Sequence, residues 1–268
     1  MATIEELRKK LRKYPLTRLL TSTGSSTIYT AFDRETDQPL VVKFYTHSID
    51  FENEIAILNK IFSHGDNSHI LPIRDTLQED YALVMPYMAG GDLWYLRRKM
   101  EGLTPEQSYA IAAQAGLALQ QVHTAGVVHN DIKSSNILLA DVDYTPNNTP
   151  LAKLTDFGLS YVEASDDNYS KLLWTAGTRE YWAPEKYCCI KPSFTSDIYS
   201  LGLVVHEMLT DMLLYRQMHL PGDKIPRHQK IPDKVLKVLR TACETKPSDR
   251  YKSAMEMISD LEKAVYGC

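Results

Sequence analysis

Short apolar runs separated by turn residues fill the first part of the chain. Three of them combine β-branched and aromatic residues as strands do, at residues 26–32, 40–45 and 81–85. Between the second and third run, residues 50–62 repeat apolar positions at the spacing of a helix. One face of that helix is expected to hold Phe51, Ile55, Leu58 and Phe62, with Glu52 and Glu54 off it. The pattern predicts a small β-rich lobe with one helix over residues 16–88.

From residue 89 onward the apolar pattern becomes helical. The tract Ala89-Gly90-Gly91-Asp92 has the glycines of a hinge, and a second lobe is expected over residues 89–268. One of its helices begins at Thr104, an N-cap followed by proline and by glutamine at N3, and ends near Gly126. The inward positions of this helix are Ile111, Ala115, Ala118 and Val122. Further helices are predicted at residues 195–210, 232–243 and 253–266.

Two segments stand apart from these lobes. Thr3 and Glu6 form a capping box before apolar residues at helical spacing, which predicts an amphipathic helix over residues 1–15 that Pro15 ends. The polar, proline-rich stretch 141–150 predicts an exposed loop. The expected fold class is therefore α+β, with a small β-rich lobe and a larger, mainly helical one. A cleft between two such lobes is a common place for a ligand.

Composition and charge narrow the range of functions. The chain has 268 residues, of which 44% are hydrophobic and 24% charged, as in an ordinary globular protein. Its net charge of −4 gives no reason to expect nucleic-acid binding. Its apolar runs are far shorter than the ~20 residues of a membrane span, and its four cysteines, without a Cys-x-x-Cys pair, favour a reducing compartment. We expect a cytoplasmic monomer or, alternatively, a protein exported into a host cell as an effector.

The densest polar cluster lies between two apolar runs, at residues 129–136. Within it, Asp131 can accept a proton from a hydroxyl, Lys133 can neutralise a phosphate, and Asn136 can offer an oxygen to a divalent cation. Twenty residues after Asn136, Asp156 precedes Phe157-Gly158. One carboxylate and one amide oxygen suit Mg²⁺, which completes its coordination with water and substrate phosphates.

In their order and spacing these motifs resemble the catalytic domain of eukaryotic-type (Hanks-type) serine/threonine protein kinases, over residues 16–261. The segment from His129 to Asn136 is similar to the catalytic loop, Asp156-Phe157-Gly158 to the DFG motif, and Ala183-Pro184-Glu185 to the APE motif. The resemblance implies a two-lobed fold that transfers the γ-phosphoryl group of ATP to a protein substrate with Mg²⁺. It implies that Asp131 positions and deprotonates the acceptor hydroxyl and that Lys133 stabilises the phosphoryl group during transfer. Asn136 and Asp156 are implied to hold the metal.

The resemblance also implies how the small lobe binds ATP. Val41-Val42-Lys43 is similar to the strand whose lysine holds the α- and β-phosphates, and Glu54, with Glu52 as the alternative, takes the place of the glutamate paired with it. Residues 83–88 resemble the hinge strand that binds adenine, with Met85 at the back of the pocket. The residues implied to contact ATP are Thr21, Thr23, Gly24, Ser26, Ile28, Val41, Lys43, Met85, Pro86, Met88, Asp92 and Leu138.

Further motifs indicate the serine/threonine class and its structural supports. Lys133 and the segment 177–183 match the serine/threonine pattern, in which Thr178 hydrogen-bonds the catalytic aspartate and lysine. Asp197 is implied to brace the backbone of the catalytic loop. Arg250 is implied to form an ion pair with Glu185.

The chain departs from the family pattern at two places that matter for function. The three glycine positions of the phosphate loop fall on Thr21, Thr23 and Ser26, with Gly24 displaced, so weaker nucleotide binding is expected from the added side chains. Asn130 replaces the arginine that precedes the catalytic aspartate, and an asparagine has no charge with which to organise a phosphate. The chain thus resembles the non-RD subtype, for which activation-loop phosphorylation is not expected to be the main switch.

Several alternatives stay open. The degenerate glycine-rich loop is compatible with a pseudokinase or scaffold that binds a protein partner. A third hypothesis is phosphoryl transfer to a small molecule. The segment 177–185, which resembles a peptide-docking segment, disfavours that hypothesis. The run Arg97-Arg98-Lys99 predicts a solvated helix face or, alternatively, a site that reads acidic substrates. Control is expected from a protein activator, from the N-terminal helix, or from neither.

Overall fold

The computed structural model describes residues 11–140, 150–212 and 225–267. It divides the chain into two compact units, which comprise Met1–Ala56 with Leu71–Met88, and Ile57–Ile70 with Ala89–Cys268. None of the helices in the described ranges is long and apolar enough to cross a membrane.

Two predicted segments fall mostly outside the described residues. Residues 1–10 of the predicted N-terminal helix lie outside them, and residues 11–15 are not helical. Of the predicted loop at 141–150, only Pro150 is described.

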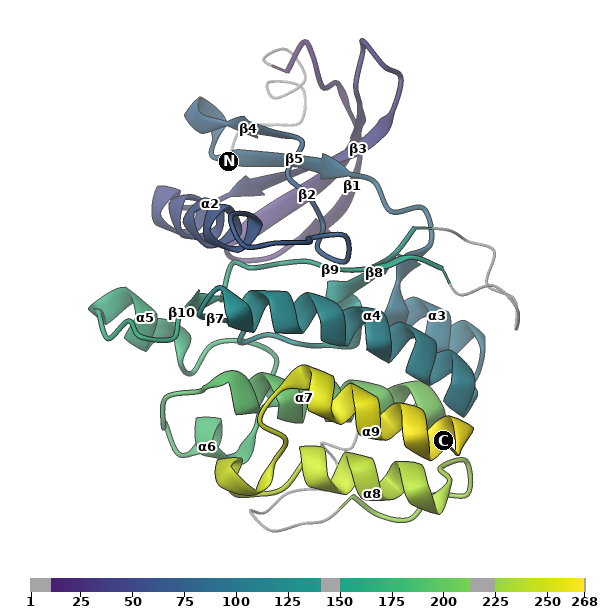
Figure 1. Ribbon diagram of the computed structural model, residues 1–268. Helices are drawn as coiled ribbons and strands as arrows, with labels where there is room; N and C mark the ends of the chain where they lie inside the picture. The colour runs from purple at the N-terminus through teal and green to yellow at the C-terminus, as the bar shows by residue number, and fades with distance from the viewer. Residues whose placement is uncertain (1–10, 141–149, 213–224, 268) are drawn as a thin grey trace. The chain divides into compact units, whose positions relative to one another are not determined.

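A five-stranded antiparallel sheet forms the body of the first unit (Figure 1). The strand order is β1-β2-β3-β5-β4, with bounds Leu16–Ser22 (β1), Ser26–Phe32 (β2), Pro39–Tyr45 (β3), Asp75–Leu77 (β4) and Ala82–Pro86 (β5). The three predicted strands correspond to β2, β3 and β5 within one residue at each end. A short 3₁₀ helix, Gln78–Asp80, precedes β5. The core of this unit is formed by Leu11, Tyr14, Leu16, Ala31, Leu40, Val42, Ala82 and Val84.

The predicted helix is α2, Ser48–Phe62, but its buried face differs from the predicted one. The buried side chains are Phe51, Glu54, Ile57, Leu58 and Ile61. The prediction is confirmed for Phe51 and Leu58 and was wrong for Ile55 and Phe62, which are only partly buried. It was also wrong for Glu54, which lies on the buried face and forms an ion pair with a lysine of β3.

Helices are the main secondary structure of the second unit (Figure 1). They are α3 (Leu93–Lys99), α4 (Pro105–Thr124), α5 (Asn168–Leu173), α6 (Pro184–Tyr187), α7 (Phe194–Thr210), α8 (Asp233–Ala242) and α9 (Ala254–Tyr266). The predicted capping box of α4 is confirmed, because Gln107 N–H donates to Thr104 Oγ1 and Thr104 N–H donates to Gln107 Oε1. All four predicted inward residues of α4 are buried. In the core, α4 packs against α7 and α9, and α8 packs against α7 and α9.

Short strands of the second unit frame the predicted catalytic loop. A three-stranded sheet has the order β6-β8-β9 and a two-stranded one pairs β10 with β7. Their bounds are Gly91–Asp92 (β6), Val127–Val128 (β7), Ile137–Leu139 (β8), Ala152–Leu154 (β9) and Tyr161–Val162 (β10). Short 3₁₀ helices lie at Ser134–Asn136, Arg179–Tyr181 and Pro247–Asp249. Residues 129–136 therefore connect two anchored strands.

Candidate active site

The Asp131 carboxylate is held from several sides in the loop between β7 and β8. Its side chain is 6% exposed, and its Oδ2 lies 2.7 Å from Lys133 Nζ. Asn136 Nδ2 donates to the Asp131 carbonyl (2.9 Å) and to Asp131 Oδ2 (3.2 Å). The 3₁₀ turn Ser134–Asn136 bends the chain back so that Asn136 reaches Asp131. The loop thus presents one fixed carboxylate beside one ammonium group.

Thr178 closes the other side of this carboxylate. Its backbone N–H donates to Asp131 Oδ1 (2.9 Å), and its hydroxyl accepts from Lys133 Nζ (2.9 Å). The predicted contacts of Thr178 with both residues are confirmed, although the contact with Asp131 is made by the backbone. Gly177 has φ +100°, and a Cβ at this position would lie 3.0 Å from Asp131 Oδ1. Only glycine therefore lets the segment approach so closely.

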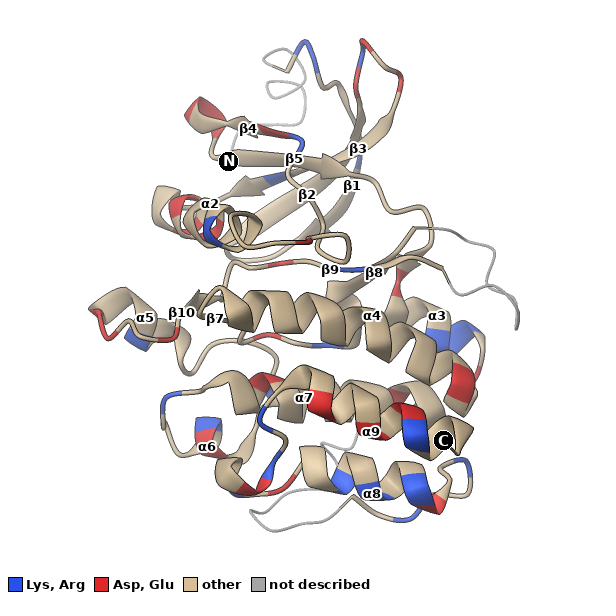
Figure 2. Cartoon of the chain, in the orientation of Figure 1, with Lys and Arg blue, Asp and Glu red and all other residues tan. Residues whose placement is uncertain are grey.

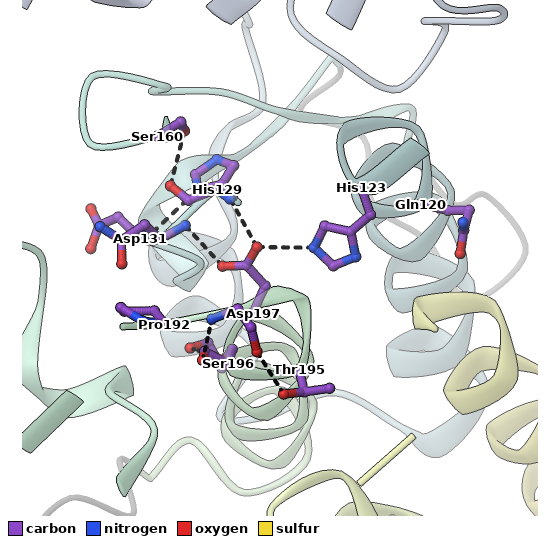
Figure 3. A network of polar contacts seen from close by, with 12 residues as sticks. Gln120, His123, His129, Asp131, Ser160, Pro192, Thr195, Ser196 and Asp197 are labelled. Carbon is purple, nitrogen blue, oxygen red and sulfur yellow. Dashed lines mark hydrogen bonds and ion pairs between the residues drawn. The ribbon is translucent and has the colours of Figure 1, made fainter. Parts of the chain in front are cut away.

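Asp197, near the start of α7, braces the backbone of the catalytic loop, as predicted (Figure 3). Its carboxylate accepts from the N–H groups of His129 and Asn130, both at 2.8 Å. His123 Nε2 also lies 2.9 Å from Asp197 Oδ2, a contact that the sequence analysis missed. The available signal was a histidine in the last turn of α4, just before the turn into β7.

The candidate metal ligands lie at matching ends of two paired strands. Asn136 precedes β8 and Asp156 follows β9 by one residue, and Thr155 N–H donates to the Asn136 carbonyl (3.0 Å) between them. Asn136 Nδ2 donates both of its hydrogens to Asp131. The amide oxygen Oδ1 is the atom of this side chain that can act as a metal ligand. Asp156 has φ +66°, at the sharp turn into the following Phe157.

The donor chemistry of this pair fits Mg²⁺. An amide oxygen and a carboxylate are hard ligands, and Mg²⁺ takes the rest of its shell from water and phosphate. No three His, Cys, Asp or Glu side chains gather into a metal site within residues 11–140, 150–212 and 225–267.

His129 packs against the turn that contains the DFG motif. Its ring lies 4.8 Å from that of Phe157, and its Nε2 lies 3.2 Å from the Thr155 carbonyl. Burial lowers the pKa of His129, so the ring is neutral at physiological pH. The backbone carbonyl of His129 accepts a hydrogen bond from Ser160 Oγ (2.9 Å; Figure 3). This bond anchors the residues that follow the DFG motif.

In the first unit, Lys43 of β3 pairs with Glu54 of α2. Lys43 Nζ lies 2.8 Å from Glu54 Oε2, and their side chains are 6% and 2% exposed. Glu52, the alternative partner, is exposed. Tyr45 adds a contact that the sequence analysis missed, because its hydroxyl donates to the same Oε2 (2.7 Å). The same Glu54 oxygen therefore accepts from both the lysine and the tyrosine.

The degenerate glycine-rich loop is the hairpin between β1 and β2, and its own polar groups close it. Thr23 N–H donates to the Ser26 carbonyl (2.8 Å), and Ser26 N–H donates to Thr23 Oγ1 (3.1 Å). A Cβ at Gly24 would meet nothing within 4 Å. Thr21 lies in β1, opposite Ile28 in β2. These side chains therefore stiffen the turn by bonding one another.

The remaining residues implied to contact ATP are divided between the units. Val41, Met85 and Pro86 lie on the paired strands β3 and β5, with Met85 and Met88 buried. Leu138 lies opposite Asp92 in the pairing of β8 with β6. Asp92 is the N-cap of α3, where its Oδ1 accepts from Tyr95 N–H (2.8 Å), and burial raises its pKa.

Figure 2 colours the lysines and arginines of the chain blue, including the basic run Arg97-Arg98-Lys99 at the end of α3. These three residues differ in burial. Arg97 is 3% exposed and forms ion pairs with Glu207 (2.6 Å) and Asp211 at the end of α7. Arg97 therefore lies neither on a solvated face nor in a site for acidic substrates, because its charge is buried and neutralised by these two carboxylates. Arg98 and Lys99 are exposed, as predicted.

Comparison with known proteins agrees with this geometry. A family model described as protein kinase domain matches residues 14–261. Serine/threonine-protein kinase PknH of Mycobacterium bovis is 30% identical over 270 residues, which cover 94% of this chain and 44% of PknH. Serine/threonine-protein kinase PknE of Mycobacterium tuberculosis is 29% identical over 268 residues, 94% of this chain and 46% of PknE. A probable serine/threonine-protein kinase of Clostridium perfringens is 26% identical over 271 residues, 94% of this chain and 38% of that protein.

The chain spans less than half the length of these curated relatives. The match to the family model nevertheless covers both units and all the motifs described above. This chain belongs to the protein kinase domain family.

Proposed function

We propose that this chain is a serine/threonine protein kinase that transfers the γ-phosphoryl group of ATP to a hydroxyl of a protein substrate, with Mg²⁺ as its metal. The observation that carries the proposal is the Asp131 carboxylate, held between Lys133, Asn136 and Thr178. The names of the relatives, all serine/threonine-protein kinases or a probable one, support the same class.

Asp131 orients the acceptor hydroxyl and takes its proton. Lys133 supplies a positive charge 2.7 Å from that carboxylate and stabilises negative charge on the phosphoryl group. Thr178 ties both groups to the segment that receives the peptide. Phosphoryl transfer needs little covalent chemistry from the protein, so a rigid arrangement of this kind supplies much of the rate.

Lys43 holds the α- and β-phosphates, kept in place by Glu54 and Tyr45. Asn136 and Asp156 would hold Mg²⁺, which would supply neutralisation of phosphate charge. The strand β5, through Met85 and the residues up to Met88, contacts adenine. The closed hairpin at Thr23 supports weaker nucleotide binding than a glycine-rich loop gives, because the N–H groups of Thr23 and Ser26 are occupied within the turn.

Activation-segment phosphorylation is not the main switch under this proposal. Asn130 carries no charge, and both hydrogens of its Nδ2 donate to backbone carbonyls, those of Leu159 (3.0 Å) and Leu173 (2.7 Å). A phosphate on the segment would find no cationic side chain at residue 130 itself. A protein activator is the proposed alternative source of control.

One observation favours a second candidate, a pseudokinase or scaffold that binds a protein partner. The hairpin at Thr23 uses its polar groups internally, which is compatible with a chain that does not grip phosphates. The fixed Asp131 carboxylate argues against this candidate, since a scaffold has no chemical need for it.

Incubation of the purified chain with ATP labelled at the γ-phosphate, Mg²⁺ and a generic basic protein distinguishes these functions. We expect label on the chain or on the basic protein. Asp156→Ala should lower the rate of label transfer about a hundredfold or more, because this variant lacks the carboxylate assigned to the metal, whose charge would stabilise the phosphates. Inositol and simple sugars serve as small-molecule acceptors in parallel reactions.

Label on inositol or sugar alone would overturn protein phosphorylation. A protein that transfers no label, whether or not it binds ATP, would favour the scaffold. Asp166→Asn is the matched control, since Asp166 is an exposed residue whose side chain is 70% accessible, and this variant should transfer label at the wild-type rate.

A further inference from the structure

Lys186 of α6 is a buried lysine whose ammonium group faces the catalytic loop. The residue is 3% exposed. Its Nζ donates to the Asn130 carbonyl (3.0 Å), to Asn130 Oδ1 (2.7 Å) and to the Ala176 carbonyl (2.9 Å). An ammonium group has three hydrogens, so these three acceptors satisfy it completely.

The charge of Lys186 is held by neutral oxygens and not by a direct ion pair. Among the described residues, no carboxylate lies within ion-pair distance of its Nζ. Burial lowers the pKa of Lys186 to about 8, and the more distant carboxylates of Asp197, Asp131 and Glu185 raise it. The ring of Trp182 lies 5.0 Å from the ammonium group. A buried lysine without a paired carboxylate is costly, which indicates that its position serves another purpose.

The partners of Lys186 lie on both sides of Asp131. The Asn130 carbonyl belongs to the peptide bond that leads into Asp131. Ala176 lies two residues before Thr178, whose N–H donates to Asp131 Oδ1. One ammonium group therefore ties together the two backbone segments that fix this carboxylate.

Asn130 and Lys186 form a matched pair. Asn130 has φ +69°, a conformation that asparagine tolerates better than most residues, and its amide oxygen faces Lys186 while its Nδ2 faces two carbonyls. An arginine at position 130 would place a second cation against a buried ammonium group, where like charges repel strongly. A neutral residue at position 130 is therefore what allows a charged lysine to be buried at position 186.

We propose that Lys186 is a positioning residue that holds the segment 176–178 and the Asn130–Asp131 peptide in the arrangement needed for phosphoryl transfer, without a phosphate on the activation segment. The inference rests on the proposed kinase function. Lys186 acts through Asn130 and Ala176 and touches neither substrate nor nucleotide in this role.

Lys186→Met tests the proposal, with Lys191→Met as the matched control. Lys191 also donates to a backbone carbonyl, that of Ser165 (2.8 Å), and lies over a tryptophan ring, that of Trp174 (5.6 Å), but it has no contact with the catalytic loop. We expect Lys186→Met to lower kcat at least about tenfold, because small misplacements of reacting groups are costly, while KM for ATP stays within about threefold. Lys191→Met should match the wild type. Equal kcat in the two variants overturns the proposal.

The pH profile of the wild type gives a second measurement that needs no variant. A neutral amine has two hydrogens for the three oxygens around Lys186, so kcat should fall as pH rises through about 8. The titration of Lys186 does not itself destabilise the fold over this pH range. The pKa of Lys186 is lower in the folded than in the unfolded state, so its deprotonation contributes increasing stability from about pH 8 to about 10.5. A kcat that stays constant to pH 9.5 overturns the proposal.

Hydrogen exchange separates failure of this inference from failure of the kinase function. Amides of residues 129–133 and 173–178 should exchange at least about tenfold faster in Lys186→Met than in Lys191→Met at pH 7, since local opening is then easier. This measurement requires no catalysis. Unchanged exchange in both segments overturns the positioning role even if the wild type is active, and faster exchange supports it even if the wild type transfers no phosphate.

Discussion

Asp131→Asn is expected to lower the rate of phosphoryl transfer at least about a hundredfold, the lower range for loss of a general base. The substitution keeps the shape of the side chain but removes its capacity to accept a proton. It also places an NH₂ group among the donors of Lys133, Asn136 and Thr178, which now point to two carboxylate oxygens. At least one of these contacts must be lost, so the acceptor hydroxyl is also less well positioned.

The measurement is the initial rate of label transfer at saturating ATP and Mg²⁺, with KM for ATP determined in parallel. We expect kcat to fall while KM stays close to its wild-type value, because Asp131 is assigned to the acceptor and not to the nucleotide. The same exchange of aspartate for asparagine at the exposed Asp166 provides the control. Retention of more than about a tenth of the wild-type kcat in Asp131→Asn would contradict the assigned role.

Arg250→Met is expected to lower the free energy of unfolding by about 3–5 kcal/mol, the usual cost of removing one partner from a buried ion pair. The side chains of Arg250 and Glu185 are 0% and 6% exposed. Two nitrogens of the guanidinium group each donate to one oxygen of Glu185, both at 2.7 Å, which confirms the predicted pair. The remaining three N–H groups donate to the carbonyls of Glu244, Thr195 and Thr245.

All five N–H donors of Arg250 are therefore in use, and methionine would replace none of them. Lysine at this position has three donors without the planar fork, so Arg250→Lys should recover only part of the loss. Urea unfolding followed by circular dichroism measures the difference. Arg227→Met, which breaks an ion pair with Asp233 whose side chains are 77% and 74% exposed, should leave the urea midpoint unchanged. An equal shift in both variants would refute the structural role of Arg250.

Acid should weaken the same ion pair. Burial alone would raise the pKa of Glu185, but the hydrogen bonds and charge of Arg250 outweigh it and lower this pKa below its usual value of 4.5. The stabilisation by the pair is therefore complete above pH 4.5 and is lost as pH falls through the lowered pKa.

Local patterns predicted the elements well where one segment determines its own structure. The capping box at Thr104 needs only residues 104–107, and the strand at 26–32 follows from its β-branched and aromatic residues. The buried faces were less predictable where a charge is involved. The apolar spacing of α2 put Glu54 outside, yet Lys43, eleven residues away, draws it into the interior.

Three of the contacts missed by the sequence analysis join residues far apart in the sequence. His123 meets Asp197 across 74 positions, Lys186 meets Asn130 across 56, and Arg97 meets Asp211 across 114. A single lysine or arginine in a local pattern is typical of the surface, and only the tertiary fold supplies the partners that allow it to be buried. The family motifs singled out Asp131, Lys133 and Asn136 as candidates, and these three residues contact one another in the structure. No local pattern around Asn130 marks Lys186 as its partner.

Phosphoamino-acid analysis tests the central claim most directly. The purified chain is incubated with γ-labelled ATP and Mg²⁺ and a generic basic protein, the proteins are hydrolysed in acid, and the labelled amino acids are separated. The account predicts label in phosphoserine or phosphothreonine, dependent on Mg²⁺ and absent with Asp131→Asn. Label in phosphotyrosine alone, or no label from a protein that binds ATP, would contradict it.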